Sequence, residues 1–242
     1  MEFINSWGNQ KRAESYASLE FPNTYHLAYR DLPEIIGKNV TGKKAIDFGC
    51  GTGRSTRFLK QLGLEATGID ISEDMLEIAR KVDPTGSYHL VSNGNYSHLG
   101  VGEYDLVQSI FTFDNIPGWE NRTRILKALG DLLNGSGRMV CLDSTPELYT
   151  HEWASFSTKD FPENWQAKTG DIVRDIMLDV EDRRPVEDVF WTVSDYHELF
   201  NRAGLELEAT YKPLGRDDEP FEWISETTVA PWMIFVLRRK KS

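Results

Sequence analysis

Three glycines and two aspartates carry the clearest chemical signal in this sequence. Residues 44–55 are KAIDFGCGTGRS, in which an apolar run broken only by Asp47 is followed by Gly49, Gly51 and Gly53. This order predicts a buried strand, a tight turn and the start of a helix, because glycine lets the backbone turn sharply and lets a ligand approach closely. At the carboxyl end of a parallel strand, such a turn forms a nucleotide-type site.

The positions of Asp47 and Asp70 indicate which nucleotide the turn would hold. Asp47 comes just before the first glycine, where a carboxylate repels a pyrophosphate and suits a positively charged ligand such as S-adenosylmethionine. Asp70 closes the next apolar run, about 20 residues farther along, where an acid can accept both ribose hydroxyls. The dinucleotide fingerprint needs a glycine where this chain has Arg54, which disfavours a nicotinamide oxidoreductase.

These motifs resemble those of a known family. Residues 47–53, DFGCGTG, resemble the first motif of class I S-adenosylmethionine-dependent methyltransferases, and residues 68–72, GIDIS, resemble their second. The resemblance implies an α/β fold with a Rossmann-like, doubly wound, seven-stranded sheet whose final strand pair is antiparallel. It also implies S-adenosylmethionine as the cofactor and S-adenosylhomocysteine as its product. It covers residues 42–143 motif by motif and the closing strands by pattern only, and it identifies no subfamily.

The resemblance also implies a set of residues around the cofactor. We expect Asp47 and Gly49 at its amino-acid end and Asp70 on its ribose. Asn95 stands where relatives often have an acid, and its amide oxygen can accept the same hydrogen bond from the adenine amine. The expected contacts are Asp47, Gly49, Cys50, Gly51, Gly53, Asp70, Ile71, Met75, Asn95, Ser109, Phe111, Tyr16 and Tyr25.

We expect one methyltransferase domain over residues 1–242. Its expected parts are an N-terminal helical lid (1–41), a cofactor-binding core (42–143), an inserted substrate cap after the fifth strand (144–192), and a C-terminal helix with the closing strands (193–242). The lid helices either touch the cofactor or simply cover one face of the sheet. Residues 144–190 are too long for an ordinary connection. Their many aromatic side chains suit a planar or apolar acceptor, or else cover the edge of the sheet.

Local patterns predict several further elements. Residues 12–20 and 25–36 have helical spacing, with a kink expected at Pro33. Residues 172–180 and 185–192 could pair as a hairpin. Ser194 could cap the last helix, expected over residues 195–203. A glycine-rich turn is expected at residues 134–138.

Two residues are candidates for a catalytic role. Asp114 follows the fourth predicted strand and could contact the sulfonium or the acceptor, or it could be a turn carboxylate. Residues 114–117, DNIP, match only poorly the D/N-P-P-Y/F motif of enzymes that methylate amino groups of nucleic-acid bases, because they hold a single proline. His151 could act as a general base, or it could be a surface or structural histidine.

Composition narrows the choice of partners and compartment. Lys and Arg total 27 and Asp and Glu total 38, and the resulting net charge of −11 disfavours tight nucleic-acid binding. Neither a signal peptide nor an apolar run of about 18 residues is present, so we expect no membrane span and a cytoplasmic location. The two cysteines and five histidines show no metal-ligand spacing. The chain could be a monomer or a homodimer.

The resulting hypothesis is methyl transfer from S-adenosylmethionine to a small-molecule acceptor. The reaction is an in-line displacement that depends mainly on proximity and orientation. The alternative is a non-catalytic S-adenosylmethionine-binding module, acting as a sensor or subunit. Such a module should lack a roomy second cavity beside the methyl group.

Overall fold

A seven-stranded sheet forms the centre of the computed structural model, which describes residues 19, 21–92 and 94–240. The strand order is β3-β2-β1-β4-β5-β10-β9. Strand β10 runs antiparallel to both of its neighbours, and the other pairings are parallel. This confirms the Rossmann-like sheet with an antiparallel final pair. The strands are β1 (Lys44–Phe48), β2 (Glu65–Asp70), β3 (Ser87–Leu90), β4 (Tyr104–Ile110), β5 (Leu133–Ser144), β9 (Leu205–Tyr211) and β10 (Trp232–Arg239).

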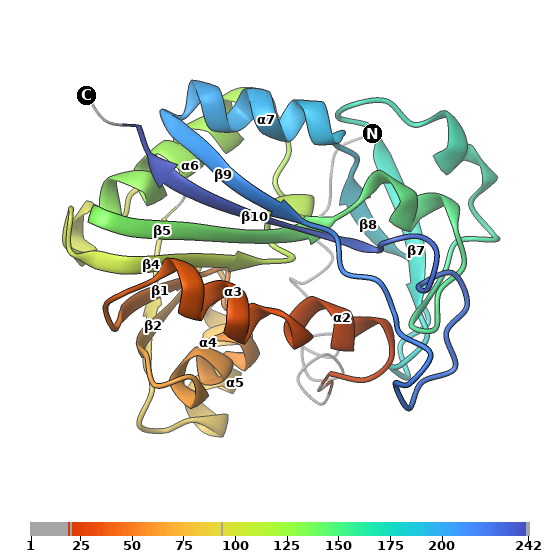
Figure 1. Ribbon diagram of the computed structural model, residues 1–242, viewed down its shortest axis with the longest axis horizontal. Coiled ribbons are helices and arrows are strands. Elements are labelled where there is room, and N and C mark those ends of the chain that lie inside the picture. The colour runs from red at the N-terminus through yellow and green to blue at the C-terminus, as the bar shows by residue number, and fades with distance from the viewer. Residues whose placement is uncertain (1–18, 20, 93, 241–242) are drawn as a thin grey trace.

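Helices cover both faces of this sheet because alternate side chains of each strand point to opposite sides. Ala45 and Val140 pack into the core cluster that holds α2, α3 and α4, whereas Ile46 and Cys141 pack into the cluster that holds α6 and α7. Figure 1 shows these two groups on opposite sides of the sheet. The helices are α2 (Thr24–Arg30), α3 (Leu32–Asn39), α4 (Arg54–Gln61), α5 (Glu73–Val82), α6 (Trp119–Leu132) and α7 (Val193–Arg202).

The N-terminal helical segment is broken where a single kinked helix was predicted. Helix α2 ends at Arg30 and α3 begins at Leu32, with Asp31 between them. Pro33 is the second residue of α3, where its missing N–H removes no intrahelical hydrogen bond. The chain therefore breaks just before Pro33. Apart from Leu19, the helix predicted over residues 12–20 lies outside the described residues.

The start of α7 corrects the predicted cap. Thr192, not Ser194, caps this helix: its hydroxyl accepts a hydrogen bond from the Asp195 amide at 3.2 Å, and the Asp195 carboxylate accepts one from the Thr192 amide at 2.8 Å. Such a reciprocal capping box needs an acid or amide three residues after the cap. Asp195 meets that requirement for Thr192, whereas Ser194 is followed at that spacing by His197.

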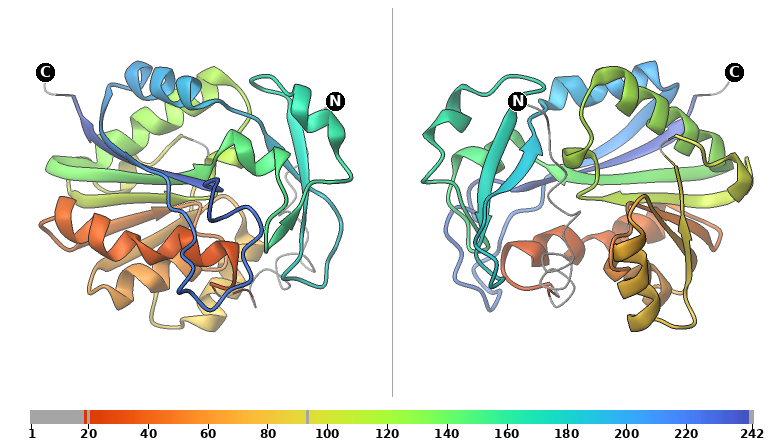
Figure 2. Two further views of the ribbon diagram at one scale, coloured as in Figure 1. Left: turned by 45° about the vertical axis from the view of Figure 1, so that its right-hand side comes forward. Right: turned by 180° about the vertical axis from the view of Figure 1, so that it is seen from behind.

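A small second sheet stands beyond the carboxyl ends of the parallel strands (Figures 1 and 2). Its strand order is β6-β7-β8, with both pairings antiparallel. The β7–β8 pairing confirms the predicted hairpin. The elements of this region are η3 (Pro146–Thr150), β6 (Phe156–Ser157), η4 (Pro162–Gln166), β7 (Ile172–Met177) and β8 (Val186–Val189).

Two irregular features complete the core. In the β4–β5 pairing, Tyr104 lies opposite Leu133 and Leu106 lies opposite Arg138, so the pairing skips the glycine-rich residues 134–137. The predicted turn is therefore present as an interruption within β5.

Two short 3₁₀ helices, η1 (Ser97–Leu99) and η2 (Phe113–Asn115), flank β4. In the ranges that the structure describes, no helix is long and apolar enough to span a membrane.

Candidate active site

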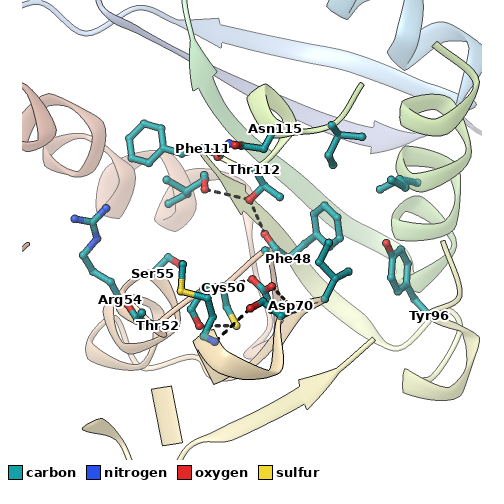
Figure 3. Close-up of a pocket in the computed structure, with 18 of the residues that line it drawn as sticks. Phe48, Cys50, Thr52, Arg54, Ser55, Asp70, Tyr96, Phe111, Thr112 and Asn115 are labelled. Atoms are coloured by element: carbon teal, nitrogen blue, oxygen red, sulfur yellow. Dashed lines mark hydrogen bonds between the residues drawn. The ribbon is translucent and has the colours of Figure 1, made fainter. Parts of the chain in front are cut away.

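The carboxyl ends of β1, β2 and β4 meet at one edge of the sheet and border a cavity of about 340 Å³. The glycine turn follows β1, Asp70 ends β2, and Phe111 follows β4. Figure 3 shows the turn and Asp70 on one side of the cavity and residues 111–115 on another. Parallel strands bring these segments together because their carboxyl ends share an edge.

The amides of the glycine turn already have hydrogen-bond acceptors within the protein. Gly49 and Cys50 donate to the Ile69 carbonyl at 2.8 and 3.1 Å, and Gly53 donates to the Cys50 carbonyl at 2.8 Å. The Gly51 amide donates to the Asp70 carboxylate at 2.8 Å. A phosphate-binding turn needs such amides directed at its ligand. A ligand can therefore approach the backbone of this turn closely, but it cannot accept hydrogen bonds from these four amides, which already donate to acceptors within the protein.

Asp70 joins the two segments that border the cavity. Its Oδ2 accepts the hydrogen bond from Gly51, and its Oδ1 accepts one from the Ser72 amide at 2.9 Å. Burial raises the pKa of the Asp70 carboxyl, and these backbone donors oppose the rise. Ser72 in turn caps α5 by accepting from the Met75 amide. One carboxylate thus fixes the turn relative to the start of α5.

An exposed apolar side chain lies beside Asp70. Ile71 is 58% exposed although it lines the cavity. Met75, Tyr96 and Ile125 also line the cavity, which gives it a largely apolar wall. The exposed side chain of Ile71, next to the carboxylate of Asp70, is suited to packing against a flat ring such as adenine.

Asp47 lies beneath the turn and does not line the cavity. It is fully buried, and its Oδ2 accepts hydrogen bonds from the hydroxyls of Ser55 and Thr56, each at 2.6 Å. Burial raises the pKa of Asp47 to about 6, against the opposing effect of these hydroxyls and of Gln108. A carboxylate at this place also interacts favourably with the N-terminus of α4. Its direct partners are therefore the first turn of that helix and, through Oδ1, the side chain of Gln108 on β4.

Arg54, at the start of α4, lies among aromatic rings. Its guanidinium carbon is 5.3 Å from the centroid of the Tyr25 ring and 5.7 Å from those of Phe21 and Tyr29. Tyr29 and Arg54 both line the cavity. In Figure 3, Arg54 and Tyr96 lie on opposite sides of it. Helix α2 therefore contributes to the cavity wall as well as covering the sheet.

Phe111 separates the main cavity from a second, smaller one. Its φ of +56° is unusual for a bulky residue. Its carbonyl accepts a hydrogen bond from the Asn115 side chain at 3.2 Å, and its ring centroid lies 4.7 Å from that of Trp232. Phe111 and Asn115 line both cavities. Strain of this kind is found at sites where function dictates the position of a side chain.

The second cavity, of about 50 Å³, combines acidic and aromatic side chains. Aspartates reach it from η2, β7 and β8. Its aromatic lining comes from α2, the end of β4, β6 and β10. The residues concerned are Asp114, Asp175, Asp188, Tyr25, Phe111, Phe156 and Trp232.

Asp114 is fixed by neighbours from three elements. Its Oδ2 accepts hydrogen bonds from the Ser144 amide at 3.0 Å and the Ser144 hydroxyl at 2.7 Å. Its Oδ1 accepts one from the Tyr196 hydroxyl at 3.3 Å. Burial raises the pKa of Asp114, while the donors and the charge of Arg122 oppose the rise.

Seven of the residues expected to contact the cofactor line the main cavity, namely Gly49, Cys50, Gly51, Asp70, Ile71, Met75 and Phe111. Gly53 forms the N-cap of α4 and lies just outside the lining. Ser109 is fully buried within β4. Asn95 is exposed and accepts a hydrogen bond from Ser97, while its neighbour Tyr96 lines the cavity. Tyr16 lies outside the described residues.

Tyr25 and the two catalytic candidates lie in other places. Tyr25 and Asp114 line the second cavity. His151 lines neither cavity; its Nδ1 lies 3.1 Å from both the Glu147 carbonyl and the Thr150 hydroxyl. Its role as a general base stays a prediction.

Sequence reasoning missed several residues of the lining. Thr112 borders the main cavity and donates a hydrogen bond to the Phe48 carbonyl, at 3.1 Å, which joins the ends of β1 and β4. Asp188 lies on β8, in the inserted segment of which only the aromatic residues indicated a role in acceptor binding. Of those aromatic residues, Phe156 is the one that reaches the second cavity. Among the described residues no cluster of histidine, cysteine and acidic side chains could hold a metal ion.

Comparisons with known proteins place the chain in a family. The family described as "Methyltransferase domain" matches residues 22–210. The ubiquinone biosynthesis O-methyltransferase of Methylococcus capsulatus is 35% identical over 83 residues, which are 33% of this chain and 35% of that protein. The match thus spans about a third of that relative. The enzyme of the same name from Nitrosococcus oceani is 27% identical over 188 residues, 73% of this chain and 70% of that protein.

A solved structure shows the same fold over the whole chain. The CcbJ methyltransferase of Streptomyces caelestis superposes with a TM-score of 0.69 and 17% identity, covering 100% of both chains. At that identity the likeness concerns the fold alone. The family match, however, covers well over half of the sequence. The chain therefore belongs to the methyltransferase-domain family, as a class I S-adenosylmethionine-dependent member.

Proposed function

We propose that this protein transfers a methyl group from S-adenosylmethionine to a small-molecule acceptor by in-line displacement. The observation that carries the proposal is the adjacency of the two cavities, which share Phe111 and Asn115. The larger cavity, at the glycine turn, suits the cofactor. The smaller one suits the end of the acceptor that receives the methyl group.

The residues of the main cavity fit the cofactor. A Cβ atom added at Gly51 would meet, beyond its two chain neighbours, no described atom within 4 Å, so the backbone here borders open space that a ligand can fill. Asp70 would hold the ribose, and Ile71 would pack on the adenine. When bound, the cofactor supplies a methyl group activated by its sulfonium, and transfer forms one bond to the acceptor as the carbon–sulfur bond breaks, with its electron pair left on sulfur.

The protein's main contribution would be alignment and the exclusion of water. Correct alignment can supply roughly 7–11 kcal/mol of barrier reduction. Phe111 and Asn115, at the junction of the cavities, are placed to orient the acceptor. A general base would add about 10²–10⁴-fold in rate if the acceptor must lose a proton.

The alternative readings receive less support. A non-catalytic cofactor-binding module has no need of a second, acid-lined cavity beside the first. A dinucleotide-binding site needs free amides in its turn, whereas those of Gly49, Cys50, Gly51 and Gly53 are engaged within the protein.

Calorimetric titration tests the cofactor assignment. We expect S-adenosylhomocysteine to bind and NAD to show no binding. Asp70→Ala should weaken S-adenosylhomocysteine binding by more than tenfold, because it removes the ribose acceptor and releases the Gly51 and Ser72 amides. Asp74→Ala is the matched control, since Asp74 is an exposed acid in the first turn of α5. Binding of NAD alone, or unchanged affinity in Asp70→Ala, would contradict the assignment.

A further inference from the structure

Acidic side chains line the second cavity. Asp114, Asp175 and Asp188 line it, and among the described residues no lysine or arginine does. The buried cation Arg122 lies nearby, but its Nε donates to the Ile116 carbonyl at 2.6 Å and its Nη2 donates to the Phe113 carbonyl. Neither of these two nitrogens is directed at Asp188, and burying a charged carboxylate is costly unless an opposite charge offsets it. A ligand that carries positive charge would reduce this cost.

Asp188 is the carboxylate best placed to meet such a ligand. It is 7% exposed, and its Oδ2 accepts a hydrogen bond from the Tyr149 hydroxyl at 3.1 Å. Its Oδ1 has no hydrogen-bond partner among the described residues, although Asp188 lines the cavity. Burial and the charges of Asp114 and Asp175 raise the pKa of the Asp188 carboxyl well above its ordinary value, while Tyr149 and Arg122 oppose the rise. Asp188 Oδ1 can thus accept a hydrogen bond from a ligand, because no residue in the described part of the chain donates to it.

The aromatic side of the cavity suits the same kind of ligand. The Trp232 ring lies 4.7 Å from that of Phe111, 5.6 Å from that of Phe156 and 6.1 Å from that of Tyr25, measured between centroids. All four residues line the cavity. The faces of aromatic rings attract ammonium groups, and more strongly where water is excluded.

We propose that the second cavity binds the ammonium end of the acceptor, so that this chain methylates an amine nitrogen. The inference rests on the proposed function and adds the chemical class of the substrate. A phenol or alcohol must lose the proton on its oxygen, and the Asp114 and Asp188 carboxylates, which line the cavity, oppose the negative charge that builds up on oxygen as that proton leaves. The same carboxylates attract an ammonium ion, and this difference makes the cavity selective.

The proton balance of the reaction fits this arrangement. A bound ammonium ion must lose one proton before its nitrogen can attack, and the Asp188 carboxylate can accept that proton. The nitrogen–carbon bond then forms as the carbon–sulfur bond breaks, and the electron pair of the broken bond remains on sulfur. At about 50 Å³ the cavity has room for an end group such as an aminomethyl group, and the rest of the acceptor lies outside it.

Binding measurements with two matched probes test the inference. Benzylamine and benzyl alcohol have the same shape and differ in charge at neutral pH. Each is titrated by calorimetry into the protein, alone and saturated with S-adenosylhomocysteine. We expect the amine to bind at least tenfold more tightly than the alcohol.

Asp188→Asn should abolish this preference. The substitution keeps the shape of the side chain, and its amide oxygen can still accept the Tyr149 hydroxyl. The affinity for S-adenosylhomocysteine should stay within twofold, which shows that the fold is intact. Asp160→Asn is the control, because Asp160 is an exposed carboxylate of the same inserted segment and lines neither cavity.

The outcomes separate the two proposals. Equal affinities for the amine and the alcohol, no binding of either, or an unchanged preference in Asp188→Asn would overturn the amine assignment. If Asp188→Asn does not fold, the amine assignment is tested by the comparison of the two probes on the wild-type protein alone. Failure to bind S-adenosylhomocysteine would defeat the proposed function instead, and the amine preference would still be measured on the protein alone.

Discussion

The two cavities of this protein are built in opposite ways. Most residues that line the main cavity come from three short stretches of chain, residues 48–55, 70–72 and 110–117. The second cavity takes single side chains from segments as far apart as Tyr25 and Trp232. The first site thus depends on local conformation and the second on how distant elements pack. Substitutions should reveal this difference, because they act on the fold in one region and on selectivity in the other.

The largest effect is expected at the glycine turn. A Cβ atom at Gly49 would lie 2.3 Å from the Thr112 side chain, and φ there is +70°. Gly49→Ala should lower the free energy of unfolding by about 3 kcal/mol, measured by urea denaturation. Gly51 also has a positive φ, of +51°, but open space around its Cβ, so Gly51→Ala should cost only about 1–2 kcal/mol. Equal losses would show that strain alone, and not crowding against β4, governs the turn.

The next effect concerns the pH dependence of stability at Asp47. Its pKa of about 6 in the folded protein lies above the ordinary value of 3.8. Its contribution to stability is therefore full below about pH 4 and is lost as the pH rises through about 6, by up to about 3 kcal/mol. Asp47→Asn should gain stability relative to the wild type over this interval, as measured by urea denaturation at a series of pH values. If the free energies of unfolding of the two proteins change with pH in parallel, burial does not raise the pKa of Asp47. Asp74→Asn, at an exposed position, serves as the control.

A smaller loss is expected in the second cavity. Ser144→Ala removes the hydroxyl that donates to Asp114 at 2.7 Å but leaves the Ser144 amide and the Tyr196 hydroxyl in place. The free energy of unfolding should fall by about 1–2 kcal/mol. Ser136→Ala, at an exposed position of β5, should change it by less than about 0.5 kcal/mol. A loss as large as that of Gly49→Ala would remove the contrast between the two regions.

The smallest effect is expected at His151. Because its side chain lines neither cavity, His151→Gln should change kcat/KM for methyl transfer by less than about twofold. A fall of about 10²-fold or more, with loss of the corresponding step in the pH profile, would establish it as the general base.

Local signals in the sequence predicted much of the main cavity. The glycine turn, the acid at the end of β2 and the apolar residue after it are contiguous motifs, and Asp70 and Ile71 both line the cavity. The β7–β8 hairpin and the antiparallel final strands were also predictable, since alternation and turn residues lie within short segments. The capping box at Thr192 and Asp195 could have been recognised from its spacing as well.

Other features could not be derived from local patterns. Asp47 is expected at the amino-acid end of the cofactor, and this stays a prediction; that it accepts hydrogen bonds from the start of α4 and from Gln108 is something that only the packing of these elements reveals. The aromatic segment after β5 indicated an apolar acceptor pocket, yet Trp153 is fully buried in the core and Trp165 is 68% exposed. Among the carboxylates of the second cavity, Asp114 was a candidate from its place after β4, whereas Asp175 and Asp188 gave no signal, because an isolated aspartate in a strand has no distinctive neighbours in sequence.

The sequence by itself determined the family, the sheet and the turn that would receive the cofactor. These depend on glycine conformations and on apolar periodicity, which act over a few neighbouring residues. The tertiary structure decided the character of the second cavity, which we propose as the acceptor site. Asp114, Asp175 and Asp188 come together only when the β7–β8 hairpin folds against the end of the main sheet, because the mutual effect of charges depends on their distance in space and on burial, neither of which is written in sequence order.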